Sequence, residues 1–336
     1  MTEQFPQRTR RYENLFMDSA RWDGFEPRPD DIFICTPYKS GTTWMQMICA
    51  LLIFRTPKLP QPLAEISPWF DMRVTPVEET LRRYAKQTHR RILKTHTALD
   101  GLPYFPQATY LYCARDPREI FISMWHHAKN QRIPHLISLL VEQGIEVAPP
   151  PPMPEDIDER FQLWLTKPAF PWEQDGFPFW SVFSHATTFW QFRTLGNIHF
   201  LHYADLMSDL DGQMRRIASI LGITVDEDVW PQLVAAATFS SMKQNADMTA
   251  PDTDLNAWQN NAAFFHRGGH GQWRDLLSDA SVRLYETVKH GKGTAEFIDY
   301  LERGLLATGI APPWHNRPLF PSGCSGGGTS RRGRAA

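Results

Sequence analysis

The sequence predicts a three-layer α/β fold, in which a mainly parallel central sheet has helices on both faces. Three observations support this prediction. Short apolar runs typical of buried strands occur at residues 32–35, 91–96, 108–114 and 198–203. Stretches with the composition of helices alternate with these runs, as in α/β proteins. The chain has 336 residues, which is enough for one large α/β domain with its own core.

We expect three regions along the chain. Residues 1–30 are polar and rich in arginine, which predicts an irregular lead-in. Residues 31–310 are expected to form a single domain, and the Gly/Ser-rich, basic residues 320–336 a disordered tail. Within the domain, the proline-rich residues 130–177 predict an irregular excursion, which is either a lid over an acceptor pocket or a packed surface subdomain.

Composition limits the classes of function. The 35 basic and 37 acidic residues are nearly balanced, so the total charge does not indicate a nucleic-acid surface. No run reaches the roughly 18 apolar residues of a membrane helix, and residues 1–8 lack the apolar core of a signal peptide. The cysteines have no metal or redox spacing, and Cys35, Cys49 and Cys113 are expected as buried thiols in a reducing cytoplasm.

The first predicted strand leads into a candidate anion site. Residues 39–43 place short side chains around Gly41, between the strand at 32–35 and a helix-like run at 44–54. A strand, a tight turn and a helix aim unpaired backbone N–H groups at an anion, and Lys39 adds positive charge. An ordinary strand-to-helix turn with a surface lysine is the alternative, because the two glycines of the nucleotide-triphosphatase loop are absent before the lysine.

The later elements follow from local signals. Residues 75–78 have the pattern of a capping box with proline at the first helical position, which predicts a helix to about residue 87. Asp116 and Pro117 predict the start of a helix after the strand at 108–114, with Arg118 facing solvent. Further helices are expected at 157–165, 180–194, 208–221, 278–290 and 294–306.

Histidines occur at two informative places. In an open parallel sheet, ligands bind beyond the carboxyl ends of the strands, so His96, which ends the second predicted strand, is expected at the same edge as Lys39. A surface histidine at a strand end is the alternative. The adjacent His126 and His127 could indicate a metal, but neighbouring residues of a helix do not share a face, so no metal site is expected there.

The run from Lys39 to Trp44, Lys-Ser-Gly-Thr-Thr-Trp, resembles the 5′-phosphosulfate loop of the cytosolic-type sulfotransferases. These enzymes use 3′-phosphoadenosine-5′-phosphosulfate (PAPS) as the sulfuryl donor, so the resemblance implies a P-loop-like fold and the product adenosine 3′,5′-bisphosphate. It also implies that Trp44 lies near the adenine and that the 5′-phosphate is held by Lys39, Ser40, Gly41, Thr42 and Thr43. The family usually has Tyr-Pro before the lysine, where this chain has Pro37 and Tyr38.

Other segments resemble the family in the same order along the chain. The run Lys94-Thr95-His96 is similar to its catalytic segment, which implies His96 as general base and Lys39 and Lys94 as catalytic cations. Arg115 and Ser123 resemble its 3′-phosphate site. Two further segments resemble its adenine contacts, and they imply Tyr203, Phe239 and Met242 as the adenine neighbours.

Residues 264–273 resemble the closing loop of the family, Arg-Lys-Gly-x-x-Gly-Asp-Trp. Arg267 takes the place of the lysine and, with Gly268, is expected at the 3′-phosphate. His266 stands where the family has arginine, and Gln272 where it has aspartate. Because a histidine is mostly neutral above about pH 6.5, this site is expected to bind the 3′-phosphate more weakly or with greater sensitivity to pH.

The resemblance implies an enzyme that transfers a sulfuryl group from PAPS to a hydroxyl without a metal. Aromatic residues are concentrated between 161 and 200 and favour an apolar acceptor: a phenol, a sterol-like compound or a lipid-linked sugar, as in the bacterial glycolipid-type members that the motifs resemble. A P-loop kinase acting on a small alcohol and a non-catalytic nucleotide-binding relative stay open as alternatives. We expect a cytoplasmic protein. The dimer segment of the family is not found near the C-terminus, so the oligomeric state is open.

Overall fold

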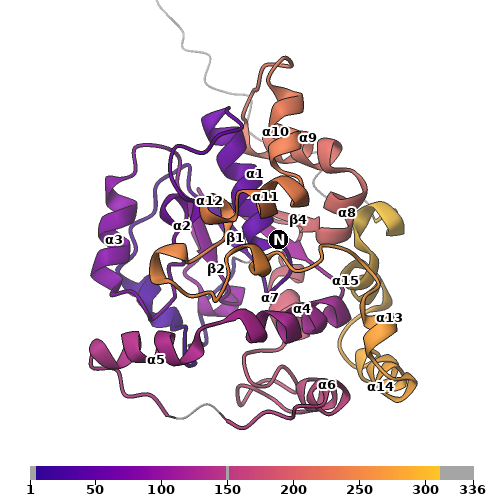
Figure 1. The fold of residues 1–336 in the computed structure, drawn as a ribbon. Coiled ribbons are helices and arrows are strands. Elements are labelled where there is room, and N and C mark those ends of the chain that lie inside the picture. Colours follow the sequence, from indigo (N-terminus) through magenta and orange to yellow (C-terminus); the bar gives the residue numbers. More distant parts are fainter. Residues whose placement is uncertain (1–4, 149–150, 311–336) are drawn as a thin grey trace, which may run out of the picture.

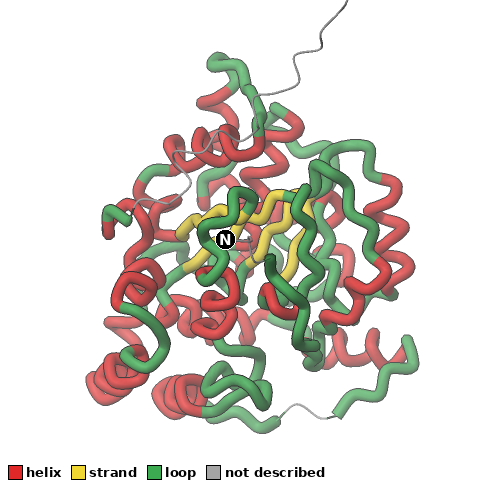
Figure 2. The backbone as a smooth tube through the Cα atoms, turned by 180° about the vertical axis from the view of Figure 1, so that it is seen from behind, coloured by secondary structure: helices red, strands yellow, loops and turns green. Residues whose placement is uncertain are grey.

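A four-stranded parallel sheet forms the centre of the molecule (Figures 1 and 2). This computed structural model describes residues 5–148 and 151–310, so the expected tail at 320–336 lies outside the described residues. The strand order is β2-β1-β3-β4. The strands are β1 (Ile32–Cys35), β2 (Ile92–Thr95), β3 (Thr109–Ala114) and β4 (Ile198–His202). Each strand lies within one of the four predicted runs.

The sheet is buried on both faces because its strands are apolar at most positions. Along β1, Ile32 and Ile34 pack into one core cluster, whereas Phe33 and Cys35 pack into another. Successive side chains of a strand point to opposite faces, so the two clusters lie on opposite sides of the sheet. The predicted three-layer α/β fold is therefore confirmed.

Helices from different parts of the chain cover the two faces. One core cluster joins the sheet to α1 (Thr42–Phe54), α9 (Leu210–Leu221) and α10 (Trp230–Ala236). The other joins it to α4 (Pro117–Asn130), α7 (Val182–Trp190) and α15 (Ala295–Thr308). In Figure 1, α9 and α10 lie above the strands and α4 lies below them.

The remaining helices lie in the connections. The α-helices among them are α2 (Leu63–Ile66), α3 (Val77–Lys86), α5 (Ile133–Glu142), α6 (Ile157–Thr166), α8 (Tyr203–Ser208), α11 (Phe239–Gln244), α12 (Ala246–Thr249), α13 (Trp273–Leu276) and α14 (Asp279–Lys289). The short 3₁₀ helices are η1 (Ser19–Gly24), η2 (Leu99–Gly101), η3 (Thr253–Leu255) and η4 (Ala262–Phe264).

Three helix predictions differ from the structure. α3 begins at Val77 with Pro76 as its N-cap, so the expected capping box does not form. α7 ends at Trp190 rather than at residue 194. The prediction that 130–177 is irregular is wrong over α5, because Pro134 stands in the first turn of that helix. Proline is tolerated there, since the N–H groups of a first turn have no helical partner.

The prediction that Arg118 faces solvent is also wrong. Its Nε and one terminal nitrogen donate to the two carboxylate oxygens of Asp116 at 3.0 and 2.9 Å. The guanidinium also lies 4.1 Å from the ring centroid of Trp273 and 4.5 Å from that of Tyr285. A capping carboxylate and two aromatic rings, which approach from distant parts of the chain, therefore compensate its burial.

The lead-in packs onto the domain. Outside η1 it has no regular helix or strand of more than one bridge, yet the side chains of Tyr12, Phe16, Trp22 and Phe25 are buried. Trp22 is 1% exposed and stacks on Phe70 with ring centroids 4.1 Å apart. The hydroxyl of Tyr12 donates to Asp100 at 2.8 Å. We therefore expect residues 5–30 to unfold together with the sheet.

Replacing Trp22 by alanine tests this expectation. Trp22→Ala should lower the free energy of unfolding by about 3–5 kcal/mol, because the core loses a large buried ring and keeps a cavity. Met207→Ala, at a side chain that is 44% exposed, should change it by less than about 1 kcal/mol. Urea unfolding of both variants measures the difference. Equal, small effects would show that the lead-in does not belong to the cooperative unit.

Candidate active site

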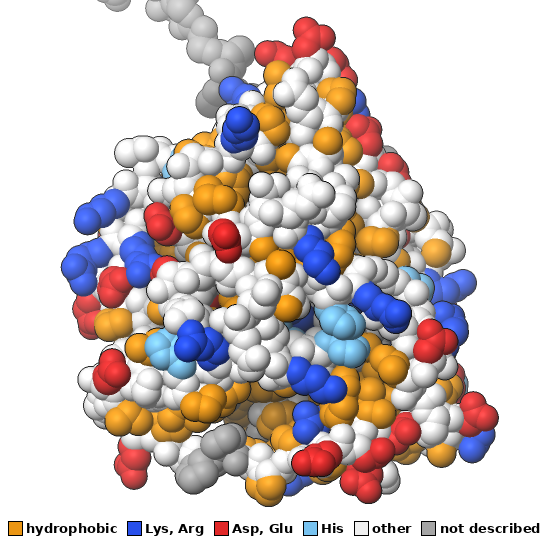
Figure 3. Space-filling view, in the orientation of Figure 1, with side chains coloured by type: hydrophobic (Ala, Val, Ile, Leu, Met, Phe, Trp, Pro, Cys, Tyr) orange, Lys and Arg blue, Asp and Glu red, His pale blue; other side chains and the backbone are white. Residues whose placement is uncertain are grey.

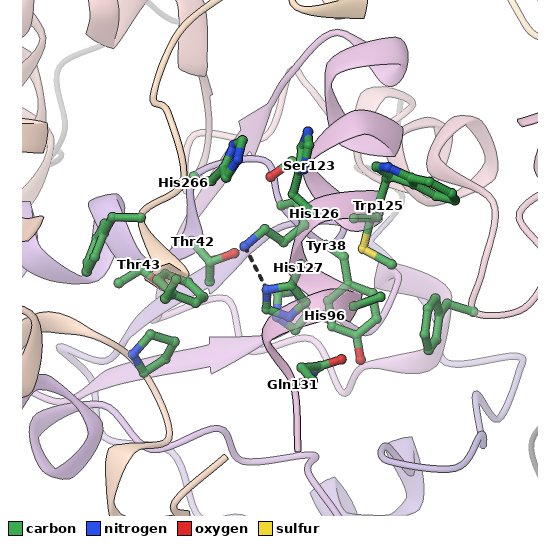
Figure 4. A pocket seen from close by; sticks show the side chains of 18 of the residues that line it. Tyr38, Thr42, Thr43, His96, Ser123, Trp125, His126, His127, Gln131 and His266 are labelled. Atoms are coloured by element: carbon green, nitrogen blue, oxygen red, sulfur yellow. Dashed lines mark hydrogen bonds between the residues drawn. The ribbon is translucent and has the colours of Figure 1, made fainter. Parts of the chain in front are cut away.

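The predicted site residues meet in one cavity at the carboxyl ends of the strands. The cavity has a volume of about 300 Å³, and β1, β2 and β3 all lead into it, because parallel strands end at the same edge of a sheet. Figure 4 shows side chains from these strand ends, from α4 and from the loop at 264–273 around it. The predicted residues that line the cavity are Lys39, Gly41, Thr42, Thr43, Trp44, Lys94, His96, Arg115, Ser123, Tyr203, Phe239, Met242, Arg267 and Gly268.

Ser40 is the predicted residue that does not line the cavity. Its side chain is buried, and its hydroxyl donates to the carbonyl of Pro37 at 2.9 Å. The serine therefore shapes the turn from inside. Any contact of this residue with a ligand would have to come from its backbone.

The turn at 39–43 has the geometry of an anion cradle. Gly41 is the N-cap of α1 at φ 104°, and no side chain caps the helix there. The N–H groups of Thr42, Thr43 and Trp44 have no acceptor among the described residues. A helix N-terminus with free N–H groups attracts anions. The φ of 104° favours glycine at this position, and a Cβ atom there would also lie 3.1 Å from the ring of Tyr203, a tight contact.

Lys39 places its ammonium inside the cavity. Nζ donates to Nδ1 of His127 at 3.1 Å, the hydrogen bond drawn as a dashed line to His127 in Figure 4. Nζ also lies 4.2 Å from the ring centroid of Phe264. Burial, and then the positive charges of Arg115 and Lys94, lower the pKa of Lys39 to about 7. A group with this pKa gains a proton readily when an anion arrives beside it.

His96 is held as a neutral imidazole, and its Nε2 has no hydrogen-bond partner among the described residues. Its Nδ1 lies 2.9 Å from the carbonyl oxygen of Thr36, which can only accept, so Nδ1 carries the proton and Nε2 keeps its lone pair. Burial, and then the charge of Lys94, lower the pKa of His96 well below its usual value. The ring lies 4.5 Å from that of Tyr38 and 4.9 Å from that of Trp69. Such a group can accept a proton at Nε2 across the neutral pH range.

Lys94 has a carboxylate partner that the sequence did not reveal. Its side chain is 5% exposed, and Nζ lies 3.4 Å from Asp252 and 4.8 Å from the ring centroid of Trp69. Asp252 sits at φ 54°, before the short helix η3. The Pro-Asp turn around it was visible in the sequence, but a turn signal does not tell which lysine the carboxylate meets.

Arg115 joins three segments of the chain. Its terminal nitrogens donate to the carbonyls of Lys39 and Gly269, both at 3.1 Å, and one of them lies 3.3 Å from Glu119. The guanidinium stacks 4.1 Å from the ring centroid of Tyr203. Its Nε is buried and has no partner among the residues that the structure describes. Arg115 therefore fixes the closing loop over the cradle and keeps one N–H available.

A second group of predicted residues lines the cavity beside the cradle at 39–43. We call this part of the cavity, with the cradle and the closing loop, the donor side. The indole N–H of Trp44 donates to the carbonyl of Ala237 at 2.8 Å, and its ring meets that of Tyr203 edge-on at 5.3 Å. A Cβ atom at Gly268 would lie 2.6 Å from the ring of Phe239, so the backbone of the closing loop rests directly on α11. These rings form an apolar wall beside the cationic end of the cavity.

The other half of the cavity is aromatic. It draws on the lead-in, on the segments between β1 and β2, on the region 130–180 and on the segment between α12 and α13. The side chains here include Phe16, Tyr38, Trp69, Met72, Leu136, Trp164, Phe179 and Trp258. On the face seen in Figure 3, histidine, lysine and arginine side chains lie beside a hollow edged by hydrophobic ones. A polar or charged ligand end and an apolar one can therefore bind in adjacent compartments.

Sequence reasoning missed several lining residues. His126 and His127 were considered for a metal, but within residues 5–148 and 151–310 no group of three or more potential ligands could hold one. Both line the cavity, together with Phe264 and Trp258. Their spacing from Ser123, three and four residues along α4, is the signal that could have found them, because such residues share a helix face.

No helix in the part of the chain that the structure describes has both the length and the apolar character needed to cross a bilayer.

Comparison with known proteins identifies the family. A family model described as a sulfotransferase domain matches residues 29–292. A glycolipid sulfotransferase of Mycobacterium bovis is 35% identical over 292 residues, covering 82% of this chain and 89% of that protein. Human sulfotransferase 1C2 is 26% identical over 285 residues, covering 82% of this chain and 87% of that protein.

Solved structures share the fold. Mouse sulfotransferase SULT7A1 complexed with PAP has a TM-score of 0.62 at 19% identity, covering 83% of this chain and 90% of that chain. Retinol dehydratase in complex with androsterone and the inactive cofactor PAP has a TM-score of 0.62 at 20% identity, covering 82% and 83%. Since the family model spans most of the chain and the mycobacterial relative matches over most of its length, this chain belongs to the sulfotransferase domain family.

Proposed function

We propose that this protein transfers a sulfuryl group from PAPS to a hydroxyl of a lipid-linked, glycolipid-type acceptor. The observation that supports it best is the meeting of two buried cations, one half-buried cation and a neutral imidazole in one cavity, whose other half is aromatic. The cations are Lys39, Lys94 and Arg115, and the imidazole is His96. The names of the mycobacterial relatives support the acceptor class.

The residues on the donor side fit a nucleotide with phosphates at both ends. The free N–H groups of α1 and the ammonium of Lys39 suit the 5′ end. Arg115, Ser123 and Arg267 suit the 3′-phosphate, since guanidinium and phosphate match in geometry. The rings of Trp44, Tyr203 and Phe239 line the same cavity and suit the stacking of adenine.

On the acceptor side, His96 takes the proton of the attacking hydroxyl at Nε2. PAPS supplies an activated sulfuryl group whose leaving group is a phosphate. Lys39 and Lys94 neutralise the charge that develops between the two oxygens, which is worth most in a cavity of low dielectric constant. The aromatic half of the cavity binds the apolar part of the acceptor and excludes water, which would otherwise compete with its hydroxyl.

Labelled PAPS tests the proposed activity directly. With ³⁵S-labelled PAPS, label should pass to a mycobacterial-type glycolipid in detergent more efficiently than to a small phenol, because the aromatic half suits a larger apolar body. Thin-layer separation of the products measures the transfer. Transfer to phenols alone would contradict the glycolipid acceptor, and transfer of phosphate from ATP with magnesium would favour a kinase instead.

His96→Ala tests the base. It should reduce turnover by about 10²–10⁴-fold, since general base catalysis contributes that much. Binding of adenosine 3′,5′-bisphosphate should change by less than about threefold, because His96 faces the acceptor. The exposed His290, at the end of α14, provides His290→Ala as the matched control. Turnover retained in His96→Ala would reject the assignment of the base.

Arg115→Ala tests the 3′-phosphate contact. It should weaken binding of adenosine 3′,5′-bisphosphate by about 10–100-fold, the usual cost of losing hydrogen bonds to a charged group. Binding of AMP, which lacks the 3′-phosphate, should fall much less. Calorimetric titration with both nucleotides gives the two ratios, and Arg215→Ala, at an exposed arginine, is the control. Equal losses for both nucleotides would reject the contact.

A further inference from the structure

Two histidines from distant parts of the chain stack at the edge of the donor side. His126 lies on α4, and His266 lies in the closing loop. Their ring centroids are 3.9 Å apart and their planes are inclined by only 14°. Both side chains line the cavity, and Figure 4 shows the two rings next to Ser123. Repulsion between two rings this close disfavours the state in which both are charged, and a negative group beside them would offset it.

The charged groups that act on the pair are all cationic. They come from every element packed around it: α4, the closing loop, α11 and the cradle. They are Lys129, Arg267, Lys243 and Lys39. No carboxylate of the described residues makes an ion pair or a hydrogen bond with either ring. Burial and these charges lower the pKa of His126 to about 4, and they also lower that of His266.

The pair lies where a phosphate would be expected. Ser123 and His126 are one helical turn apart and share the face of α4 that meets the cavity. Arg267 follows His266 directly, and the neighbouring Gly269 carbonyl accepts from Arg115. Two basic side chains and a hydroxyl therefore line the same cavity as the two imidazoles. Glu119 lies 3.3 Å from Arg115, but among the described residues no carboxylate pairs with either imidazole or with Arg267.

We propose that the stacked His126–His266 pair is a binding site for the 3′-phosphate of the nucleotide, and that the pair takes up a proton when the phosphate binds. The proposal rests on the proposed function, because it assumes a nucleotide with a 3′-phosphate. In the empty protein both rings are neutral. A phosphate dianion beside them favours the charged form, and the added proton then turns one imidazole into a donor for the phosphate.

The sign of the pH dependence follows from the direction of the pKa change. Binding raises a histidine pKa from its lowered value, so the complex holds more protons than the free protein. Binding therefore tightens as the pH falls, by up to about tenfold for each pH unit if one proton is taken up. Below about pH 6 the phosphate itself gains a proton, so the useful range lies above that value.

Calorimetry in two buffers of different ionisation enthalpy measures the protons taken up. The experiment titrates the protein near pH 6.5 with adenosine 3′,5′-bisphosphate and, separately, with AMP. The difference between the two nucleotides should be about half to one proton in the native protein. Subtracting AMP removes the contribution of Lys39, whose pKa of about 7 makes it gain a proton at the 5′ end.

Histidine variants distinguish proton uptake by the His126–His266 pair from proton uptake by other groups. The double variant His126→Asn, His266→Asn should abolish the difference in proton uptake between the two nucleotides and weaken binding of the bisphosphate. His266→Arg supplies a fixed charge, so it should bind the bisphosphate with little dependence on pH between about 6.5 and 8.5. His290→Asn, at an exposed histidine, should behave as the native protein.

The outcomes distinguish this proposal from the proposed function. If the protein binds neither nucleotide, the proposed function is wrong, and this inference falls with it. If it binds the bisphosphate more tightly than AMP but with equal proton uptake, the donor site stands and the role of the pair is overturned. An unchanged difference in the double asparagine variant would overturn that role as well.

Discussion

The structure depends on keeping several positive charges in a buried cavity with few carboxylates to balance them. Lys94 has Asp252 at 3.4 Å, and Arg115 has Glu119 at 3.3 Å. Lys39 pairs with no carboxylate among the described residues, and its ammonium lies beside an imidazole nitrogen and an aromatic face. Burying unbalanced charge costs free energy, and here the cost appears as the low pKa of Lys39. An anionic ligand removes this cost, so part of its binding energy is already stored in the empty protein.

The same constraint explains why His96 stays neutral. The surrounding rings of Tyr38 and Trp69 exclude the water that would solvate an imidazolium, and its charge would add to that of Lys94. The Thr36 carbonyl fixes the proton on Nδ1 without adding a full negative charge, as a carboxylate would. The lone pair of Nε2 therefore stays available to accept a proton, although Lys94 and Lys39 lie nearby. Charge and tautomer are set by one backbone hydrogen bond and by the field of the neighbouring lysines.

Much of this arrangement could be predicted from the sequence, because it follows from local patterns. Apolar runs located all four strands, and the parallel order brings their carboxyl ends together, so the meeting of Lys39, His96 and Arg115 follows. What could not be predicted depends on contacts between distant segments. Arg118 was expected in solvent, but rings from α13 and α14 cover it. No local pattern predicts that Asp252 pairs with Lys94. α5 was not predicted, because Pro134 stands in its first turn and was interpreted as a helix breaker.

The departures from the family pattern make physical sense when they are considered together. Replacing the arginine of the closing loop by His266 removes a permanent charge from a site that already holds Arg115 and Arg267. The loss would leave the phosphate with fewer fixed donors, but His126 stands opposite and supplies a second titratable ring. Two neutral imidazoles, half-buried at His126 and exposed at His266, add no charge to this cationic site in the empty protein, whereas one more guanidinium would add one. Such a site would bind the 3′-phosphate with an affinity that depends on pH, whereas a site with a third arginine would bind it with an affinity that depends little on pH.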